Sequence, residues 1–468
     1  MKVLLICAEN YSVGVGPFAR AVGSMVLAYR KQGAEVLGFS PFFSKFEKEN
    51  EYSEVGKSVE KLRNLEYSVL KRNSKEPFED LFIGFDDYFG RNGIYGDENE
   101  KSYMDNHLRF SFLASAAINY CIDMKFKPDA IHVHDWSGIA GVLTKNLYSE
   151  HFRNIPVVLT VHSICYDFHC TPLHIHKMGL PSEDFNADGY EFWDKVSMLK
   201  VAILYSDKIV FTSDSYLPYL LETDLPGGMR GFLESQSRKL LSIQSGVDYD
   251  VLDIPKECEE FKKKRKEEFK AELGLEANSG ILLYTQLNVD FNSSAQVIST
   301  ILANLLNMNL QLAIGVSEDN PNYSYFTTIQ EKNRSKMVLL PFAEDDKSLL
   351  YRFFSVDLFF SLSAENPSLE NFFKAAAAGC VPLSSKRTKI YSSFLRPLSE
   401  LKEEERDKAN SFIAQAASPD LILEQICFAE SVYNNDKSLW SKIVKNALNI
   451  RVPLDEMAKK YFSIFTPN

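Results

Sequence analysis

Long apolar runs and paired cysteines are both missing from this chain of 468 residues. No run approaches the roughly 18 residues that a membrane span requires, so we expect no membrane partner. The apolar run at 3–7 is too short for a signal-peptide core, and no small-residue cleavage site follows it. The seven cysteines are odd in number, scattered and without a C-x-x-C pair. This pattern favours reduced thiols and a cytoplasmic location.

Basic residues are also scarce, with 52 Lys and Arg against 63 Asp and Glu, which gives a net charge of −11. This balance argues against nucleic acid as a partner, because nonspecific binding depends on neutralising phosphates. An anionic substrate would need a local basic pocket. A complete dinucleotide fingerprint is absent as well. Gly14 and Gly16 follow a short strand, but without the full G-x-G-x-x-G they favour a tight strand-to-helix turn.

What the sequence does have is a regular alternation of strand and helix signals, which predicts an α/β fold with parallel sheets. Expected strands lie at 2–7, 35–39, 130–133, 157–161, 208–211, 280–284, 310–315, 337–340, 358–361 and 381–383. Expected helices lie at 18–31, 105–124, 191–205, 418–432, 437–450 and 454–464.

Two charged regions interrupt this alternation. Residues 41–101 hold few strand signals, and we expect an insertion of exposed helix or loop there. Residues 253–275 are dense in Glu and Lys, as a solvated helix or a linker is. The chain therefore divides into an α/β domain at 1–250, a charged linker at 251–278, an α/β domain at 279–450 and a final helix at 451–468.

Five cysteines and histidines lie within twelve residues, namely Cys165, His169, Cys170, His174 and His176. Their spacing, C-x3-H-C-x3-H-x-H, fits no common zinc pattern. We expect no metal here, and interpret the segment as a loop beside a binding pocket.

Several longer motifs are more specific, and their order and spacing hold over the whole first domain. They are Asn92-Gly93-Ile94-Tyr95-Gly96-Asp97, His132-Val133-His134-Asp135-Trp136, Thr160-Val161-His162 and Phe185-Asn186-Ala187-Asp188-Gly189. Together they resemble the bacterial glycogen synthase and plant starch synthase family. The resemblance implies the GT-B fold, with two Rossmann-like domains, a cleft between them and a final helix that crosses back to the first domain. It also implies transfer of glucose from ADP-glucose to an α-1,4-glucan, without a cofactor.

The resemblance assigns roles in the first domain, on the acceptor side. His162 matches a histidine that lies against the donor sugar, although Ser163 replaces the asparagine that follows it in the family. The matched positions for substrate binding are Gly14, Gly16, Tyr95, Asp105, Asn106, His134, Asp135, Trp136 and Tyr166. The loop with Gly14 and Gly16 lacks the lysine that the family uses there, and Ser137 replaces a family histidine.

The second domain, on the nucleotide-sugar side, departs further from the family. The arginine and lysine that clamp the diphosphate are matched by Gln286 and Phe291, and the key glutamate is matched by Asn366. A shift of one residue would place Glu365 at the last position. Nearby positive charge is available from Lys386, Arg387 and Lys389.

These replacements bear directly on activity. Losing one preorganised electrostatic group typically lowers the rate by about 10²–10³, and three such groups are missing here. Our hypothesis is a weakly active or inactive family member that acts as a glucan-binding or regulatory protein. The alternative is an active glycogen synthase, or a glycosyltransferase with a changed nucleotide-sugar donor.

Overall fold

The chain folds into two compact units in the computed structural model. The first comprises Met1–Thr212, Leu220–Gln244 and Leu454–Asn468, and the second comprises Ser213–Tyr219 and Ser245–Pro453. The structure describes residues 1–9, 17–44, 51–73, 80–97, 101–164, 168–222, 228–250, 252, 254–255, 257–277, 280–287, 292–318, 320–343, 346–362, 370–386 and 394–466. In this described part, no helix has both the length and the apolar character needed to cross a membrane.

The first unit is built on a nine-stranded sheet with the order β12-β11-β7-β6-β1-β2-β5-β4-β3. Its strands are β1 (Lys2–Ile6), β2 (Glu35–Pro41), β3 (Tyr52–Glu60), β4 (Leu65–Arg72), β5 (Asp80–Gly84), β6 (Ala130–His134), β7 (Val157–Val161), β11 (Lys208–Phe211) and β12 (Leu240–Ser242). β1 pairs in parallel with both β2 and β6. The five strands expected here from the alternation are confirmed, and the strand order reverses between β1 and β6.

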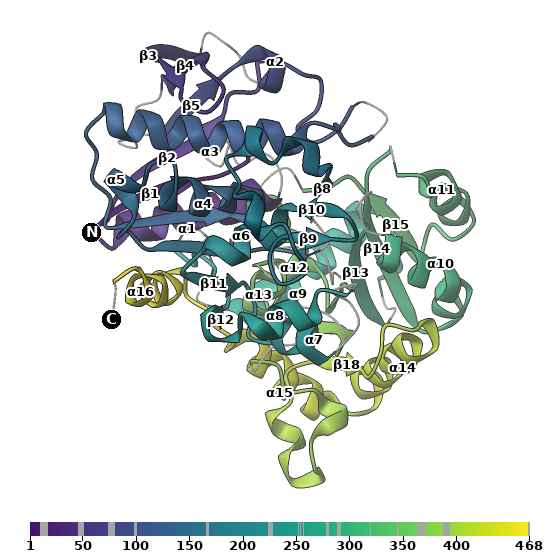
Figure 1. Ribbon diagram of the computed structural model, residues 1–468. Coiled ribbons are helices and arrows are strands. Elements are labelled where there is room, and N and C mark those ends of the chain that lie inside the picture. The colour runs from purple at the N-terminus through teal and green to yellow at the C-terminus, as the bar shows by residue number, and fades with distance from the viewer. Residues whose placement is uncertain are drawn as a thin grey trace. The chain divides into compact units, whose positions relative to one another are not determined.

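Helices cover both faces of this sheet (Figure 1). α1 (Pro17–Lys31) and α16 (Leu454–Phe465) share one core with Val36 of β2. On the opposite face, the ring of Phe39 meets Tyr120 of α3 (Asn106–Asp123). The two strand residues lie on different faces because side chains alternate along a strand. The last helix of the chain therefore belongs to the first unit.

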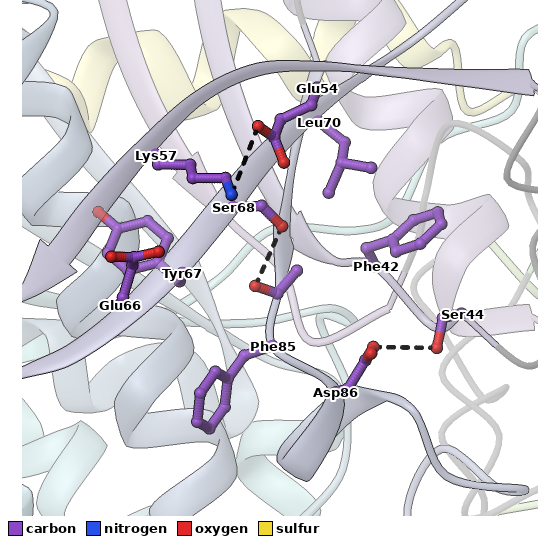
Figure 2. A pocket seen from close by; sticks show the side chains of 11 residues that line it. Phe42, Ser44, Glu54, Lys57, Glu66, Tyr67, Ser68, Leu70, Phe85 and Asp86 are labelled. Carbon is purple, nitrogen blue, oxygen red and sulfur yellow. Dashed lines mark hydrogen bonds and ion pairs between the residues drawn. The ribbon is translucent and has the colours of Figure 1, made fainter.

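The region at 41–101 is not the exposed helix or loop that its composition suggests. It supplies three strands, β3, β4 and β5, that extend the sheet, with β3 and β4 antiparallel. β3 is hard to recognise because it is an edge strand with charged side chains in solvent, such as Glu54 and Lys57. A hollow of about 420 Å³ lies on these strands (Figure 2). Its lining residues include Phe42, Tyr67 and Phe85.

The helix expected at 191–205 is also wrong in its first half. A hairpin is formed there by β9 (Glu191–Phe192) and β10 (Lys195–Ser197). The helix that follows, α6 (Met198–Tyr205), begins only at Met198. β10 pairs with β8 (His169–Cys170) as well, which makes a small three-stranded sheet. The helix starts at this point because the side chain of Ser197 accepts a hydrogen bond from Lys200 N at 3.0 Å, as an N-cap does.

The second unit holds a six-stranded parallel sheet with the order β15-β14-β13-β16-β17-β18. Its strands are β13 (Ile281–Leu287), β14 (Leu310–Val316), β15 (Met337–Leu340), β16 (Leu358–Phe360), β17 (Val381–Ser385) and β18 (Phe412–Ala414). Alternate residues of β13 enter two separate cores, Leu283 on one face and Leu282 on the other. The expected strands of this half are confirmed.

The helices of the second unit are α9 (Cys258–Glu272), α10 (Asn292–Asn307), α11 (Tyr323–Lys332), α12 (Asp346–Ser355), α13 (Glu370–Ala377), α14 (Pro419–Asn435) and α15 (Lys437–Leu448). The three expected C-terminal helices, α14 to α16, are confirmed. The remaining short α-helices among the described residues are α2 (Asp86–Phe89), α4 (Ala140–Lys145), α5 (Ser149–Phe152), α7 (Tyr216–Glu222) and α8 (Arg230–Ser235).

The charged run near 253–275 is an integral helix of the second unit rather than a separate linker. One face of α9 is exposed, whereas Lys262 and Phe269 are buried on the other. Lys262 Nζ donates to the carbonyl of Phe353 at 3.1 Å, and Lys266 pairs with the buried Asp357. The lysines are thus anchored by acceptors that the sequence pattern does not reveal.

Candidate functional site

The candidate site lies where three neighbouring parallel strands of the first unit end. β7, β6 and β1 are adjacent in the sheet, and their carboxyl ends lead to His162, Asp135 and Glu9. The strand order reverses between β6 and β1, and open α/β sheets bind ligands at such a switch point. Sequence reasoning named two of these three residues.

The ring of His162 is held from several sides. Its Nε2 lies 3.0 Å from Nδ1 of His134, and its backbone N–H donates to Oδ1 of Asp135 at 2.9 Å. The ring of Phe18 meets it edge-on with centroids 4.8 Å apart. Burial lowers the pKa of His134 to about 3, so this histidine is neutral at ordinary pH. Its neutral ring contacts His162 without placing a positive charge beside it.

Asp135 sits in a strained backbone conformation at the end of β6, with a φ of 45°. Non-glycine residues in this region cost conformational energy and tend to occur at functional sites. Ser137, which replaces a family histidine, secures this turn. Its Oγ lies 2.9 Å from the backbone N of His134 and 2.8 Å from the carbonyl oxygen of Ile6. The serine thereby ties the ends of β6 and β1 together.

Glu9 is the residue that sequence reasoning missed. Tyr95 donates its hydroxyl hydrogen to Oε1 of Glu9 at 2.8 Å, and Ser40 donates to the Glu9 carbonyl at 2.9 Å. Burial raises the pKa of Glu9 to about 7, so the carboxyl exchanges a proton near neutral pH. The ring of Tyr95 in turn packs on Trp136, with centroids 5.1 Å apart. The only sequence signal was an acidic residue at the end of a buried strand.

Asp105 and Asn106 lie at the start of α3, where their contacts are with Arg91, Tyr95 and Arg109. Both carboxylate oxygens of Asp105 accept hydrogen bonds from Arg91 at 2.7 Å. Asn106 is fully buried and donates to the carbonyl of Tyr95 at 2.7 Å, while its own Oδ1 accepts from Arg109 at 2.6 Å. Asn106 therefore fixes the backbone that carries Tyr95.

A second histidine contact fastens the segment that follows His162. Nε2 of His107 on α3 lies 2.6 Å from Nδ1 of His174, and burial lowers the pKa of His107 to about 4. The ring of Phe168 stacks on His107 and also packs against Trp136, with centroids 5.7 Å apart. Among the residues that the structure describes, no three potential ligands gather as a metal site.

In the second unit, Gln286 lies near the carboxyl end of β13, which is adjacent to β16. Its Oε1 accepts a hydrogen bond from Asn371 at 3.3 Å. Lys386, at the end of β17, forms an ion pair with Glu400 at 2.7 Å. The remaining predicted site residues lie outside the described residues, namely Gly14, Gly16, Tyr166, Phe291, Asn366 and Arg387.

Sequence comparison matches residues 2–235 to the starch synthase catalytic domain. A glycogen synthase from Pseudothermotoga lettingae is 26% identical over 99% of this chain and 98% of its own length. A glycogen synthase from Treponema denticola is 24% identical over the same shares of the two chains. The similarity thus extends over both units.

The folds agree as well. The catalytic domain of starch synthase IV from Arabidopsis thaliana, bound to ADP and acarbose, superimposes with a TM-score of 0.84 at 19% identity, over 99% of this chain and 98% of that domain. HepE from Anabaena, in complex with UDP and glucose, gives 0.55 at 11% identity, over 99% of both chains. These likenesses establish a GT-B fold of two Rossmann-like domains. The chain belongs to the glycogen and starch synthase family.

Proposed function

We propose that this protein binds an α-1,4-glucan and transfers glucose from ADP-glucose weakly or not at all, because its donor site has decayed. It then serves the cell as a glucan-binding or regulatory member of the family. A cytoplasmic location is consistent with its cysteines, since the six within the described residues are free thiols.

The observation that carries the proposal is the environment of Gln286, at the position where the family has arginine. This neutral amide is bound to another neutral amide, that of Asn371. A leaving diphosphate needs positive charge to balance its own as the bond to the sugar breaks. Two amides supply dipoles but no countercharge. Phe291 and Asn366, where the family has lysine and glutamate, remove two more charged groups.

Two lysines that could compensate are already engaged within the second unit. Lys374 pairs with Glu370 at 3.2 Å, and both side chains are buried. Lys386 pairs with Glu400. Using either lysine to bind phosphate would leave its carboxylate partner uncompensated, which is most costly for the buried pair. These contacts weigh against the alternative that Lys386 restores the donor site.

The first unit supports the glucan half of the proposal. The aromatic and hydrogen-bonding groups around His162 are well packed. The relatives are glycogen synthases, and the Arabidopsis starch synthase domain is bound to ADP and the saccharide acarbose. The ordered His162 site also favours a second candidate function, a transferase with another nucleotide-sugar donor. A protein that had lost all activity would have no need to keep the side chains around His162 in this arrangement.

The test is release of ADP from ADP-glucose with glycogen as acceptor, alongside cosedimentation of the protein with glycogen. An active glycogen synthase relative serves as the positive control. We expect glycogen binding without appreciable turnover. Turnover of order 1 s⁻¹, within the usual enzyme range, would refute decay of the donor site. Turnover with UDP-glucose alone would favour the altered-donor candidate, and absence of glycogen binding would refute the glucan half.

A further inference from the structure

The β9–β10 hairpin of the first unit has an unusual turn. Its two central residues, Trp193 and Asp194, both have positive φ, 52° and 60°. Two-residue turns of this kind normally carry Asn-Gly or Asp-Gly, because a side chain in the left-handed region meets its own backbone. A tryptophan is among the residues least suited to that position.

Packing does not explain the choice of tryptophan. Trp193 as a residue is 77% exposed, so it gains little from burial in the unit. The turn is instead held by the backbone N–H of Asp194, which donates to Oε1 of Glu191 at 2.7 Å. Neighbouring contacts thus keep an exposed residue in a strained backbone conformation. Such strain indicates that the residue serves a function other than stabilising the fold.

The exposed indole continues a row of rings. Phe192 meets Trp193 with centroids 6.1 Å apart, and Phe192 stacks on His169 of β8 at 5.3 Å and an interplanar angle of 23°. His169 is exposed and Phe192 is half-buried. Gly228 faces the same rings, and a Cβ there would lie 3.7 Å from Phe192. The hairpin therefore presents an aromatic strip to solvent.

The hairpin is also continuous with the candidate site. The backbone N–H of Met198, directly after β10, donates to the carbonyl of Phe168 at 3.0 Å. The ring of Phe168 packs on Trp136, which lies at the end of β6. Phe168 thus links the hairpin to the turn that carries Trp136.

The charges on the hairpin indicate the class of ligand. Glu191, Asp194 and Lys195 carry both signs, and the hairpin has no basic cluster suited to phosphate. An aromatic face without a basic cluster suits the apolar face of a pyranose ring, because the indole supplies a large contact area and the rim of hydroxyls stays in water.

We infer that Trp193, with Phe192 and His169, forms a platform on which a glucose unit of an α-glucan stacks. The platform lies outside the His162 site and holds a distant part of the chain. This inference rests on the proposed function, in that the ligand is the glucan proposed above.

The experiment compares the wild type with Trp193→Asn in titrations with maltoheptaose and in cosedimentation with glycogen. Asparagine tolerates positive φ, so the variant should unfold at the same temperature as the wild type or higher. We expect its affinity for maltoheptaose to fall about tenfold, the size of a lost aromatic contact. Tyr325→Asn removes an exposed ring from α11 in the other unit and should leave the affinity unchanged.

The outcomes are distinct. Equal affinities of the wild type and Trp193→Asn would overturn the platform and leave the proposed function intact. A wild type that binds no glucan would refute the proposed function itself. Loss of self-association without loss of glucan affinity would assign the indole to a second copy of the chain. Should Trp193→Asn fail to fold, Trp193→Phe and Trp193→Leu distinguish the contribution of an aromatic ring from that of side-chain volume. Equal affinities of these two variants for maltoheptaose would overturn the inference.

Discussion

The carboxyl group of Glu9 is buried, and burial disfavours its charged form. Its pKa rises from 4.5 to about 7 in the folded protein. Between these values the folded state keeps a proton that the unfolded state has released, so the free energy of unfolding falls as pH rises. The full decline is about 3 kcal/mol, at about 1.4 kcal/mol per pKa unit. Glu9 therefore stabilises the protein relatively more at acidic pH than at pH 8.

Replacing Glu9 with glutamine should remove this contribution. The amide oxygen still accepts the hydrogen bond from Tyr95, but the side chain no longer titrates. The difference in unfolding free energy between Glu9→Gln and the wild type should grow in favour of the variant, by a few kcal/mol, from pH 5 to pH 8. Denaturant unfolding across this range measures it. Parallel pH curves for the two proteins would show that Glu9 is ionised throughout.

Some residues of the site can be recognised from their neighbours in the sequence, whereas others depend on contacts with distant segments. His162, His134 and Asp135 could be predicted because each directly follows or ends a buried strand within a recognisable motif. Glu9 could not, because its shifted pKa depends on burial and on Tyr95, which is 86 positions away in the sequence. Asn106 stays a predicted binding residue, and its contact with the Tyr95 carbonyl, at 2.7 Å, is one that the sequence does not reveal.

At the scale of elements, close approach between segments explains where glycine is required. Gly138 lies in the turn after β6, against α6. A Cβ on Gly138 would lie 3.0 Å from Leu159 Cδ1 and 3.1 Å from Ala202 Cα, and would overlap the Ala202 methyl group. The turn carrying Asp135 and Ser137 thus packs on α6 with no room for a side chain.

Gly138→Ala should destabilise the protein by about 1–3 kcal/mol through overpacking. Adding Ala202→Gly should recover part of this loss, because the two changes share one contact. Gly231→Ala is the matched control, since a Cβ at Gly231 in α8 meets nothing within 4 Å. Thermal unfolding of the three variants and the wild type measures these effects. A Gly138→Ala protein as stable as the control would mean that the turn shifts freely away from α6.

Some strands of the protein could be predicted from the sequence pattern and others could not. The strands with continuous apolar runs were predicted because burial on both faces leaves no other residue types available. β3 was missed because an edge strand in solvent has no such constraint. The helix predicted over the β9–β10 hairpin is wrong because the turn uses Trp193 and Asp194 instead of glycine, so no helix-breaking residue marks it.

For the whole molecule, family membership and fold follow from features spread along the chain, whereas the loss of activity is proposed from three positions. Parallel strands alternating with helices specify each Rossmann-like unit, and substitutions at strand ends leave that pattern untouched. A donor site can therefore change while the fold persists. The question for this protein is whether the rest of the site still supports chemistry.

Restoring the family residues answers it. Gln286→Arg, Phe291→Lys and Asn366→Glu together return two cations and a carboxylate. If these are the only groups lost, ADP release from ADP-glucose with glycogen should rise by at least about 10²-fold over the wild type, the typical value of one such group. The effects need not add, because the groups act on one transition state. The reversed-charge set, with Gln286→Glu and Phe291→Asp, is the control and should stay inactive. A restored protein that binds glycogen but releases no ADP would mean that decay extends to the first unit, with the loop at Gly14 and Gly16 the next part to rebuild.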